Sequence, residues 1–230
     1  MSKQKKATKK ATKGNGRGSR AYRIIYALLS GAVGLIFRIK VVNAAKEPDE
    51  GGYVVCANHI SATDPIIICY AFKKHQVHFM AKKELFKIPV LSGLIRMLGA
   101  FPIDRTGNDV GAIKNAVRIV NEGKALGVFP QGHRYPEQDP RQTKTKNGAV
   151  LIASKVGAPI VPVYIWRKGN KAGVFRRTYV IIGEKIPFES FGYDKEQSGE
   201  YSRITGEVFD RICTLGETFD PKKYKEEKSK

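Results

Sequence analysis

The chain has 230 residues, enough for one domain with a sizeable apolar core. Its 41 Lys and Arg residues against 21 Asp and Glu residues give a formal net charge of +20. Such an excess directs attention to polyanionic partners, either nucleic acid or anionic lipid. Cys56, Cys69 and Cys213 show neither metal-ligand spacing nor a disulfide framework. This excludes a disulfide-stapled scaffold and indicates core cysteines in a reducing compartment.

Positive charge is concentrated at the start of the chain. Residues 1–23 contain nine Lys and Arg residues and no acidic residue, and Gly14, Gly16 and Gly18 lie among them. A segment of this composition cannot bury a core, so we expect a disordered basic tail. Such a tail could bind either anionic lipid or nucleic acid. The alternative is a solubilising leader that has no specific partner.

An apolar segment follows the tail. Residues 24–37 carry no charge and lie between Arg23 and Arg38. A helix of these 14 residues spans about 21 Å, whereas the hydrocarbon core of a bilayer is about 30 Å thick. We therefore expect residues 24–40 to form a helix that lies in the membrane interface, held there by the basic tail. A buried core helix and a signal peptide are the alternatives.

Short strand-like and helix-like segments alternate beyond this point. Apolar, β-branched runs predict strands at 53–57, 76–81, 100–103, 126–129, 160–165 and 178–183. Helices are predicted at 65–73, 90–98, 109–121, 147–156 and 202–215. The alternation predicts a single α/β domain over residues 48–218, with a largely parallel sheet flanked by helices. Residues 219–230 are predicted to be a charged, frayed C-terminal tail.

The helix predicted at 109–121 has the clearest pattern. Val110, Ile113, Val117 and Val120 recur at helical spacing and form one apolar face. Gly123 follows at the position of a C-terminal cap. We therefore expect this face to lie against the core.

Polar residues gather where the predicted strands end. His59 follows the strand at 53–57, Asp104 and Arg105 follow 100–103, and residues 131–134 follow 126–129. In open α/β sheets, ligands bind at the carboxyl ends of parallel strands. We therefore expect these residues to share one site at that edge.

His59 and Asp64 are five residues apart. On one continuous helix such residues point about 140° apart, so they could not meet there. Here they flank a strand-to-helix junction, with Asp64 expected at the N-cap and Pro65 at the first helical position. A carboxylate that accepts a hydrogen bond from one imidazole nitrogen fixes the tautomer and leaves the other nitrogen free as a base. No Ser or Cys nucleophile is needed if the substrate supplies a hydroxyl.

Four segments in order resemble the motifs of the lysophospholipid acyltransferase family, which includes the 1-acylglycerol-3-phosphate (lysophosphatidic acid) acyltransferases. Together they cover roughly residues 50 to 185, and any one of them alone would be weak evidence. The four are Asn58-His59 with Asp64, Gly-Ala-Phe-Pro-Ile-Asp-Arg at 99–105, Phe-Pro-Gln-Gly-His-Arg at 129–134 and Ile-Val-Pro-Val at 160–163.

The resemblance implies a glycerolipid acyltransferase-like fold and a role in phospholipid biosynthesis. A fatty acyl group would pass from acyl-CoA or acyl carrier protein to the free hydroxyl of 1-acylglycerol-3-phosphate and give phosphatidate. His59 would be the general base and Asp64 its orienting partner. The thioester is a substrate, so no cofactor and no metal are expected. The expected partners are membrane lipids at the cytoplasmic face, the lysophospholipid acceptor and the acyl donor, with no nucleic acid.

Arg105 and Arg134 are the candidates for binding the acceptor phosphate, because a guanidinium can donate two parallel hydrogen bonds to it. Gly132 is expected to let the backbone approach the ligand or take a positive φ. Lys146 precedes a predicted helix, in a place similar to that of a basic pair in family members. A solvated basic loop explains Lys146 equally well.

Two residues depart from the family pattern. Gln131 stands where the family has glutamate and keeps one acceptor without the charge, and His133 stands where it has Thr or Ser. Both residues are further candidates for contact with the acceptor phosphate, and His133 alternatively points to solvent. The departures leave open another lysophospholipid or an amino-lipid as acceptor, or a non-catalytic lipid-binding relative. A basic nucleic-acid-binding protein is supported by charge alone, since no zinc-finger or RNA-binding signature is present.

Overall fold

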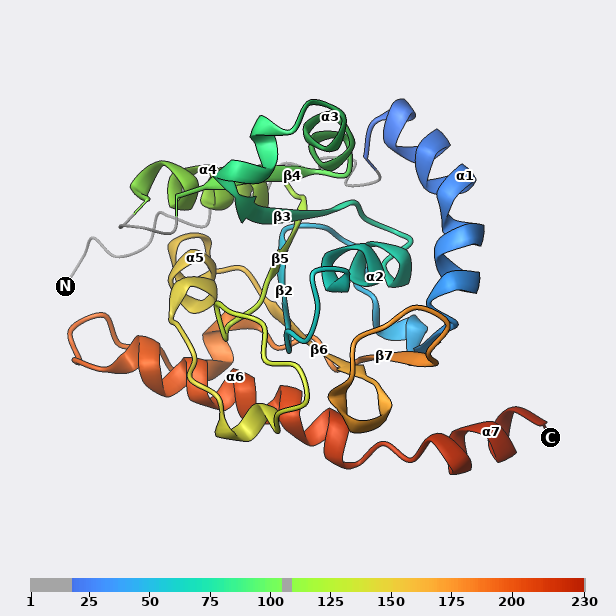
Figure 1. Ribbon diagram of the computed structural model, residues 1–230. Helices are drawn as coiled ribbons and strands as arrows, with labels where there is room; N and C mark the ends of the chain where they lie inside the picture. The colour runs from blue at the N-terminus through green and yellow to red at the C-terminus, as the bar shows by residue number, and fades with distance from the viewer. Residues whose placement is uncertain (1–17, 105–108, 230) are drawn as a thin grey trace.

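A computed structural model describes residues 18–104 and 109–229 (Figure 1). In this part of the chain one seven-stranded sheet has the order β1-β7-β6-β2-β5-β3-β4. The strands are β1 (Ile39–Val42), β2 (Tyr53–Ala57), β3 (Val77–Lys82), β4 (Ala100–Ile103), β5 (Ala125–Val128), β6 (Ile160–Trp166) and β7 (Thr178–Ile182). The five strands from β6 to β4 are mutually parallel, while β7 pairs antiparallel with β6, and β1 is parallel to β7. The predicted, largely parallel sheet is confirmed.

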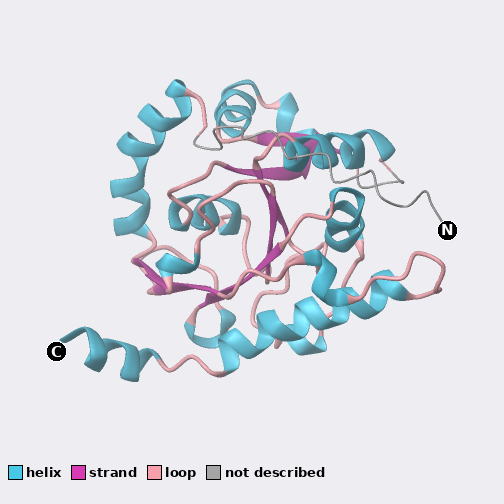
Figure 2. Ribbon diagram, turned by 180° about the vertical axis from the view of Figure 1, so that it is seen from behind, coloured by secondary structure: helices cyan, strands magenta, loops and turns pink. Residues whose placement is uncertain are grey.

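Helices cover both faces of the sheet. They are α1 (Arg20–Ile36), α2 (Asp64–Ala71), α3 (Pro89–Met97), α4 (Val110–Asn121), α5 (Gly148–Val156), α6 (Glu200–Glu217) and α7 (Pro221–Ser229). Figure 1 shows α4, α5 and α6 on one side of the central strands and α1 and α2 on the other, and Figure 2 shows the same division from behind. The predicted α/β domain is therefore present, with element boundaries within two residues of those expected.

The central strand β2 explains why the core has two halves. All five of its residues are buried. Val54 and Cys56 belong to the cluster under α4, α5 and α6, whereas Tyr53 and Val55 belong to the cluster under α2. Successive side chains of a strand point to opposite faces of the sheet, so a continuous apolar run is what a strand covered on both sides requires. This burial makes β2 a rigid support for the loop that carries His59.

The N-terminal region differs from the expectation. The apolar helix α1 begins at Arg20, inside the predicted basic tail, and residues 1–17 of that tail lie outside the described residues. Residues 39 and 40, predicted to end the helix, begin β1 instead. Because β1 pairs with β7, the folded domain starts before residue 48, where the sequence placed its boundary.

The C-terminal end also differs. Residues 221–229, predicted to be a frayed tail, form α7. The Phe219 ring lies 4.9 Å from the ring of Tyr179 in β7, and the Tyr224 ring lies 5.6 Å from it, centroid to centroid. These two aromatic residues pack the end of the chain against the sheet. In the sequence they stand among charged residues, so the segment was predicted to be a tail.

Candidate active site

His59 and Asp64 meet across the loop between β2 and α2, as predicted. The protonated Nδ1 of His59 donates a hydrogen bond to Asp64 Oδ2 over 2.9 Å, because a carboxylate accepts and has no proton to give. The Asp64 side chain is fully buried, and that of His59 is 11% exposed. The Nε2 atom is thereby left as the acceptor, which is the arrangement of a general base.

Asp64 also holds the loop that presents His59. Its Oδ2 atom accepts the backbone N–H groups of Ile60 and Ser61, at 2.6 and 2.7 Å. The expected N-cap role of Asp64 is wrong, because Asp64 is already the first residue of α2 and Thr63 stands at the N-cap. The carboxylate turns back to the loop amides and the imidazole, so it is not available to cap the helix.

Gln131 fixes the backbone of His59 from the neighbouring loop after β5. Its Oε1 atom accepts the His59 N–H at 2.6 Å, and its Nε2 atom donates to Thr143 Oγ1 at 2.7 Å. The Thr143 hydroxyl is then free to donate to the Pro140 carbonyl at 2.6 Å. A glutamate at this position could not donate to Thr143. Since Gln131 is buried and both ends of its amide bond the protein, the geometry favours a positioning role over the expected phosphate contact.

Two further contacts hold the His59 backbone in place. The Tyr135 N–H donates to the His59 carbonyl at 2.9 Å. The buried Asn58 side chain pairs with Ile165 in β6, accepting its N–H at 2.7 Å and donating to its carbonyl at 3.1 Å. The side chain of Asn58 thus continues the β2–β6 ladder beyond the end of β2, which explains why an amide precedes the histidine.

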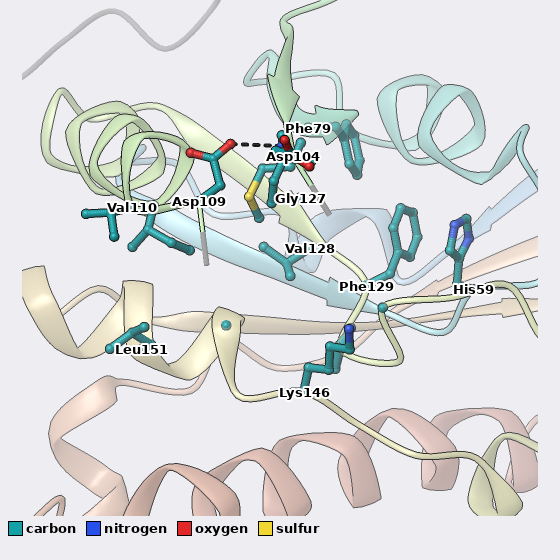
Figure 3. A pocket seen from close by; sticks show the side chains of 16 residues that line it. His59, Phe79, Asp104, Asp109, Val110, Gly127, Val128, Phe129, Lys146 and Leu151 are labelled. Carbon is teal, nitrogen blue, oxygen red and sulfur yellow. Dashed lines mark hydrogen bonds between the residues drawn. The ribbon is translucent and has the colours of Figure 1, made fainter. Parts of the chain in front are cut away.

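The ring of His59 stacks on an aromatic column. Its centroid lies 4.0 Å from that of Phe129, with an interplanar angle of 13°, and Phe129 lies 5.6 Å from Phe79. Figure 3 shows the three rings in sequence. Gly127 makes room for the column, since a Cβ there would lie 2.1 Å from the Phe79 ring. The column restrains the imidazole plane in addition to the Asp64 hydrogen bond.

His59 stands at one end of a cavity of about 680 Å³. Its walls are mostly apolar and come from β3, β4, β5, α4 and α5, with lining side chains that include Phe79, Met80, Ile103, Val110, Ile113, Val128 and Leu151. Figure 3 shows Val110 and Leu151 at the end remote from His59. A cavity of this kind fits a ligand with a long apolar part whose reacting polar end lies at the imidazole.

The predicted apolar face of α4 is confirmed except at its first residue, Val110. The buried residues of α4 are Ala112, Ala116, Ile119 and Val120, whereas Val110 is 59% exposed. Ile113 and Val117 pack against the buried core, and Ile113 also lines the cavity together with Val110. The apolar pattern was therefore partly that of a ligand-binding wall. Gly123 does take the left-handed conformation, with φ of 77°, just past the end of α4.

The residues predicted to bind the acceptor phosphate lie in different places relative to the cavity. Gly132 has the expected positive φ, 68°, and it lines the cavity beside Lys146, whose Cδ would lie 2.9 Å from a Cβ at Gly132. His133 and Arg134 are exposed and lie outside the cavity lining. Arg105 falls outside the described residues. Within the described chain, Lys146 is therefore the cation of this group that reaches the cavity.

Sequence reasoning missed Arg167. Its Nη1 atom lies 3.2 Å from Asp64 Oδ1, with both side chains at most 1% exposed. Its Nε atom donates to Thr178 Oγ1 at 3.2 Å. Burial lowers the pKa of Arg167, while the carboxylate of Asp64 opposes that shift. The available signal was its position, directly after the fourth motif strand and at the same edge of the sheet as His59.

The site thus combines a parallel α/β sheet, a His–Asp pair at the carboxyl edge of that sheet and an apolar cavity beside the imidazole. Residues 38–166 match the Acyltransferase family, and the chain belongs to it. It is 31% identical over 175 residues to the 1-acyl-sn-glycerol-3-phosphate acyltransferase of Bacillus subtilis, covering 75% of this chain and 82% of that protein. The resemblance read from the four motifs is confirmed.

Other similar proteins carry the same name. Identity is 35% over 148 residues with the 1-acyl-sn-glycerol-3-phosphate acyltransferase of Streptococcus pneumoniae, covering 61% of this chain and 54% of that protein. The enzyme of the same name from Saccharomyces cerevisiae is 28% identical over 205 residues, covering 84% of this chain and 65% of the relative. The crystal structure of the LPA acyltransferase PlsC from Thermotoga maritima has a TM-score of 0.63 at 24% identity, covering 85% of this chain and 83% of its own, and supports the fold.

Proposed function

We propose that this protein is an O-acyltransferase that transfers a fatty acyl group to 1-acylglycerol-3-phosphate and forms phosphatidate. The observation that carries the proposal is the free Nε2 atom of His59 at the end of an apolar cavity, with Nδ1 held by the buried Asp64. The names of the relatives support the acceptor. Another lysophospholipid or an amino-lipid is the alternative acceptor.

The chemistry needs no acyl-enzyme. Nε2 of His59 takes the proton of the acceptor hydroxyl as its oxygen attacks the thioester carbonyl carbon. The carbon–sulfur bond of the resulting tetrahedral adduct then breaks, and the leaving sulfur takes the proton from the imidazolium. The ester and the free thiol are the products, and His59 returns to its neutral form. Asp64 stabilises the imidazolium between the two steps without accepting its proton.

The cavity supports a binding site for the acyl chain. Its apolar walls lead from His59 to Val110 and Leu151, and burying a chain of methylene groups there contributes about 0.8 kcal/mol for each CH₂. Either coenzyme A or acyl carrier protein is proposed as the carrier of the donor thioester, with no additional cofactor. The acceptor phosphate would lie near Lys146, with Arg105 and Arg134 as further cationic partners.

We also propose that α1 contacts the membrane on its cytoplasmic face. Leu28 and Leu35 are 73% and 74% exposed, and Phe175 in the β6–β7 loop is 66% exposed. The Phe175 N–H donates to the Ile36 carbonyl at 2.6 Å, so the loop adjoins the end of α1. Exposed apolar side chains beside basic residues such as Arg38 suit a bilayer with anionic lipids. Among residues 18–104 and 109–229, no helix is long and apolar enough to span a bilayer.

The test is acyl transfer by the purified full-length protein. Lysophosphatidate and a panel of other lysophospholipids and amino-lipids are each supplied with acyl-CoA or acyl carrier protein thioester, and free thiol and lipid product are both measured. The expected result is His59-dependent thiol release with phosphatidate as the preferred product. Absence of thiol release with every donor and acceptor would contradict the enzymatic function and favour a lipid-binding role. Preference for another acceptor would retain the acyl transfer and replace the substrate.

A further inference from the structure

Arg167 contacts the side of Asp64 that His59 leaves open. Oδ2 of Asp64 accepts three hydrogen bonds, whereas Oδ1 has the Arg167 Nη1 atom as its neighbour at 3.2 Å. Water does not screen this pair, since Asp64 and Arg167 are 0% and 1% exposed at their side chains. Three groups in contact thus lead from the protein interior to the cavity, in the order Arg167, Asp64 and His59.

The fold also anchors Arg167. Arg167 directly follows β6, and Thr178, which accepts its Nε–H, is the first residue of β7. Two residues before Arg167, Ile165 is bonded through its backbone to the Asn58 side chain. The guanidinium and the His59 loop are therefore both anchored on β6, the guanidinium also through β7 and the loop also through β2.

We infer that Arg167 is a positioning residue for the catalytic pair, one that holds Asp64 ionised and keeps its Oδ2 atom directed at His59. The inference rests on the proposed acyl transfer. A carboxylate removed from water needs a compensating charge, and a guanidinium supplies one reliably because it keeps its proton in proteins. With His59 in the neutral form that a general base requires, the three groups sum to zero charge.

Removing the Arg167 guanidinium should leave the three groups with an excess of negative charge. The two backbone amides on Oδ2 still favour an ionised Asp64, so its charge becomes uncompensated and attracts a proton to His59. A protonated His59 cannot act as a base, so the acid limb of the kcat/KM profile should move to higher pH. Other ionisable groups around the cavity, Lys146, Asp104 and Asp109, are unaltered by the substitution.

The experiment compares Arg167→Met, Arg167→Lys and Thr178→Val in the full-length protein. Arg167→Met should lower kcat by up to about a hundredfold, the size of a small misplacement of a catalytic group. It should also raise the acid limb by roughly one pH unit. Arg167→Lys and Thr178→Val keep the positive charge, so each should lower kcat less and leave the acid limb at its parental pH. Circular dichroism and thermal melting establish the folded fraction of each variant.

A second readout does not depend on turnover. The imidazole titration of His59, followed by NMR and assigned with His59→Gln, should move to higher pH in Arg167→Met and stay in place in Thr178→Val. If Arg167→Met does not fold, the inference is tested with Arg167→Lys and Thr178→Val, which keep the positive charge. A parental kcat in both of these variants would overturn the inference. Activity lost only in proportion to folded protein, with an unmoved titration, would overturn it too. A parental protein that transfers no acyl group contradicts the proposed function instead, while the titration still tests Arg167.

Discussion

At the residue scale, His59 is held by its ring and by its backbone at once. Asp64 and Phe129 restrain the imidazole, while Gln131 and Tyr135 bond the N–H and C=O groups of the same residue. A general base works when its free nitrogen stays within hydrogen-bond reach of the proton that it removes. The contacts around His59 therefore fix the orientation of both its ring and its backbone.

Replacing the base should stop the reaction. We expect His59→Ala to lower kcat by about 10² to 10⁴, because proton abstraction is lost. Asp64→Asn should be severe but less complete, since the amide keeps the shape and can favour the wrong tautomer. The measurement is steady-state acyl transfer, with circular dichroism as the control for folding. A folded His59→Ala protein with near-parental turnover would remove His59 from its role.

Gln131→Ala tests whether this residue positions the loop or binds phosphate. The substitution removes both side-chain hydrogen bonds and should cost about 1–3 kcal/mol of unfolding free energy, measured by urea denaturation. A loosened His59 backbone should lower kcat about tenfold, within the range for misplaced catalytic groups. The KM for the lysophospholipid should change no more than the KM for the thioester. A selective rise in the acceptor KM would instead assign Gln131 to the phosphate.

At the scale of elements, α4 and α5 act as walls of the cavity as well as covers of the sheet. Asp109 caps α4 by accepting the Ala112 N–H at 2.8 Å and also accepts the Asp104 N–H at 2.8 Å. The start of α4 is thereby joined to the end of β4. This joint places Val110 at the end of the cavity remote from His59 (Figure 3).

Filling that end should shorten the acyl chains that the enzyme accepts. Val110→Trp is expected to lower kcat/KM for the longest chains about 10- to 100-fold, the loss of two or three buried methylene groups. Short chains should react at the parental rate, because the space next to His59 is unchanged. Val174→Trp, at another exposed valine outside the cavity, is the matched control. An unaltered chain-length profile in Val110→Trp would place the acyl chain elsewhere.

The start of α6 offers a test of stability against pH. Hydrogen bonding by Arg203 lowers the pKa of the Glu200 carboxyl to about 2. Because this pKa lies below the usual value of about 4.3, the pair stabilises the fold at higher pH, and this stability is lost as the pH falls through that window. Arg203→Met should therefore lower the Tm near neutral pH, with a difference that shrinks towards pH 2. A Tm difference independent of pH would exclude this origin.

Arg118→Met is the control for the α6 experiment. Arg118 on α4 forms an exposed ion pair with Glu122, the C-cap residue of this helix, at 3.3 Å. Exposed pairs of this kind contribute about 0–1 kcal/mol. The Tm of Arg118→Met should therefore remain close to that of the parental protein across the same pH range.

At the scale of the whole molecule, α1 and the β6–β7 loop form one outward surface. Tyr26 and Tyr22 face the domain from α1, the former donating its hydroxyl to the Tyr70 carbonyl at 3.0 Å. Leu28 and Leu35 point away from the domain and are exposed. One face of α1 thus packs on the protein and the other is exposed. The proposed membrane contact uses this exposed face, and the net charge of +20 would add attraction to anionic lipids.

Leu28→Ser combined with Leu35→Ser should weaken binding to anionic vesicles in a sedimentation assay. The loss of two apolar contacts should reduce the partition constant by at least about tenfold. Acyl transfer to a short-chain, soluble acceptor should be unchanged, because neither residue lines the cavity. Tyr22→Phe, on the buried side of the same helix, is the control. Undiminished vesicle binding by the double variant would show that another surface meets the membrane.

Local sequence patterns predicted most of this architecture. The apolar runs of β2 and β6 marked central strands because a strand covered on both faces has to be apolar throughout. The pairing of His59 with Asp64 followed from a spacing that only a loop between strand and helix can close. These features depend on residues close together in the chain, so the sequence by itself determined the contact between His59 and Asp64 and the class of fold.

Contacts between distant segments were decided by the tertiary structure alone. Arg167 reaches Asp64 only because β6 lies beside β2 in the sheet, and Gln131 reaches His59 only because β5 lies on the other side of β2. The short strand β1 became recognisable through its pairing with β7. No local periodicity records which strands become neighbours, since that order results from the packing of the whole chain. The same order sets the charge next to Asp64 and the backbone bonds that hold His59.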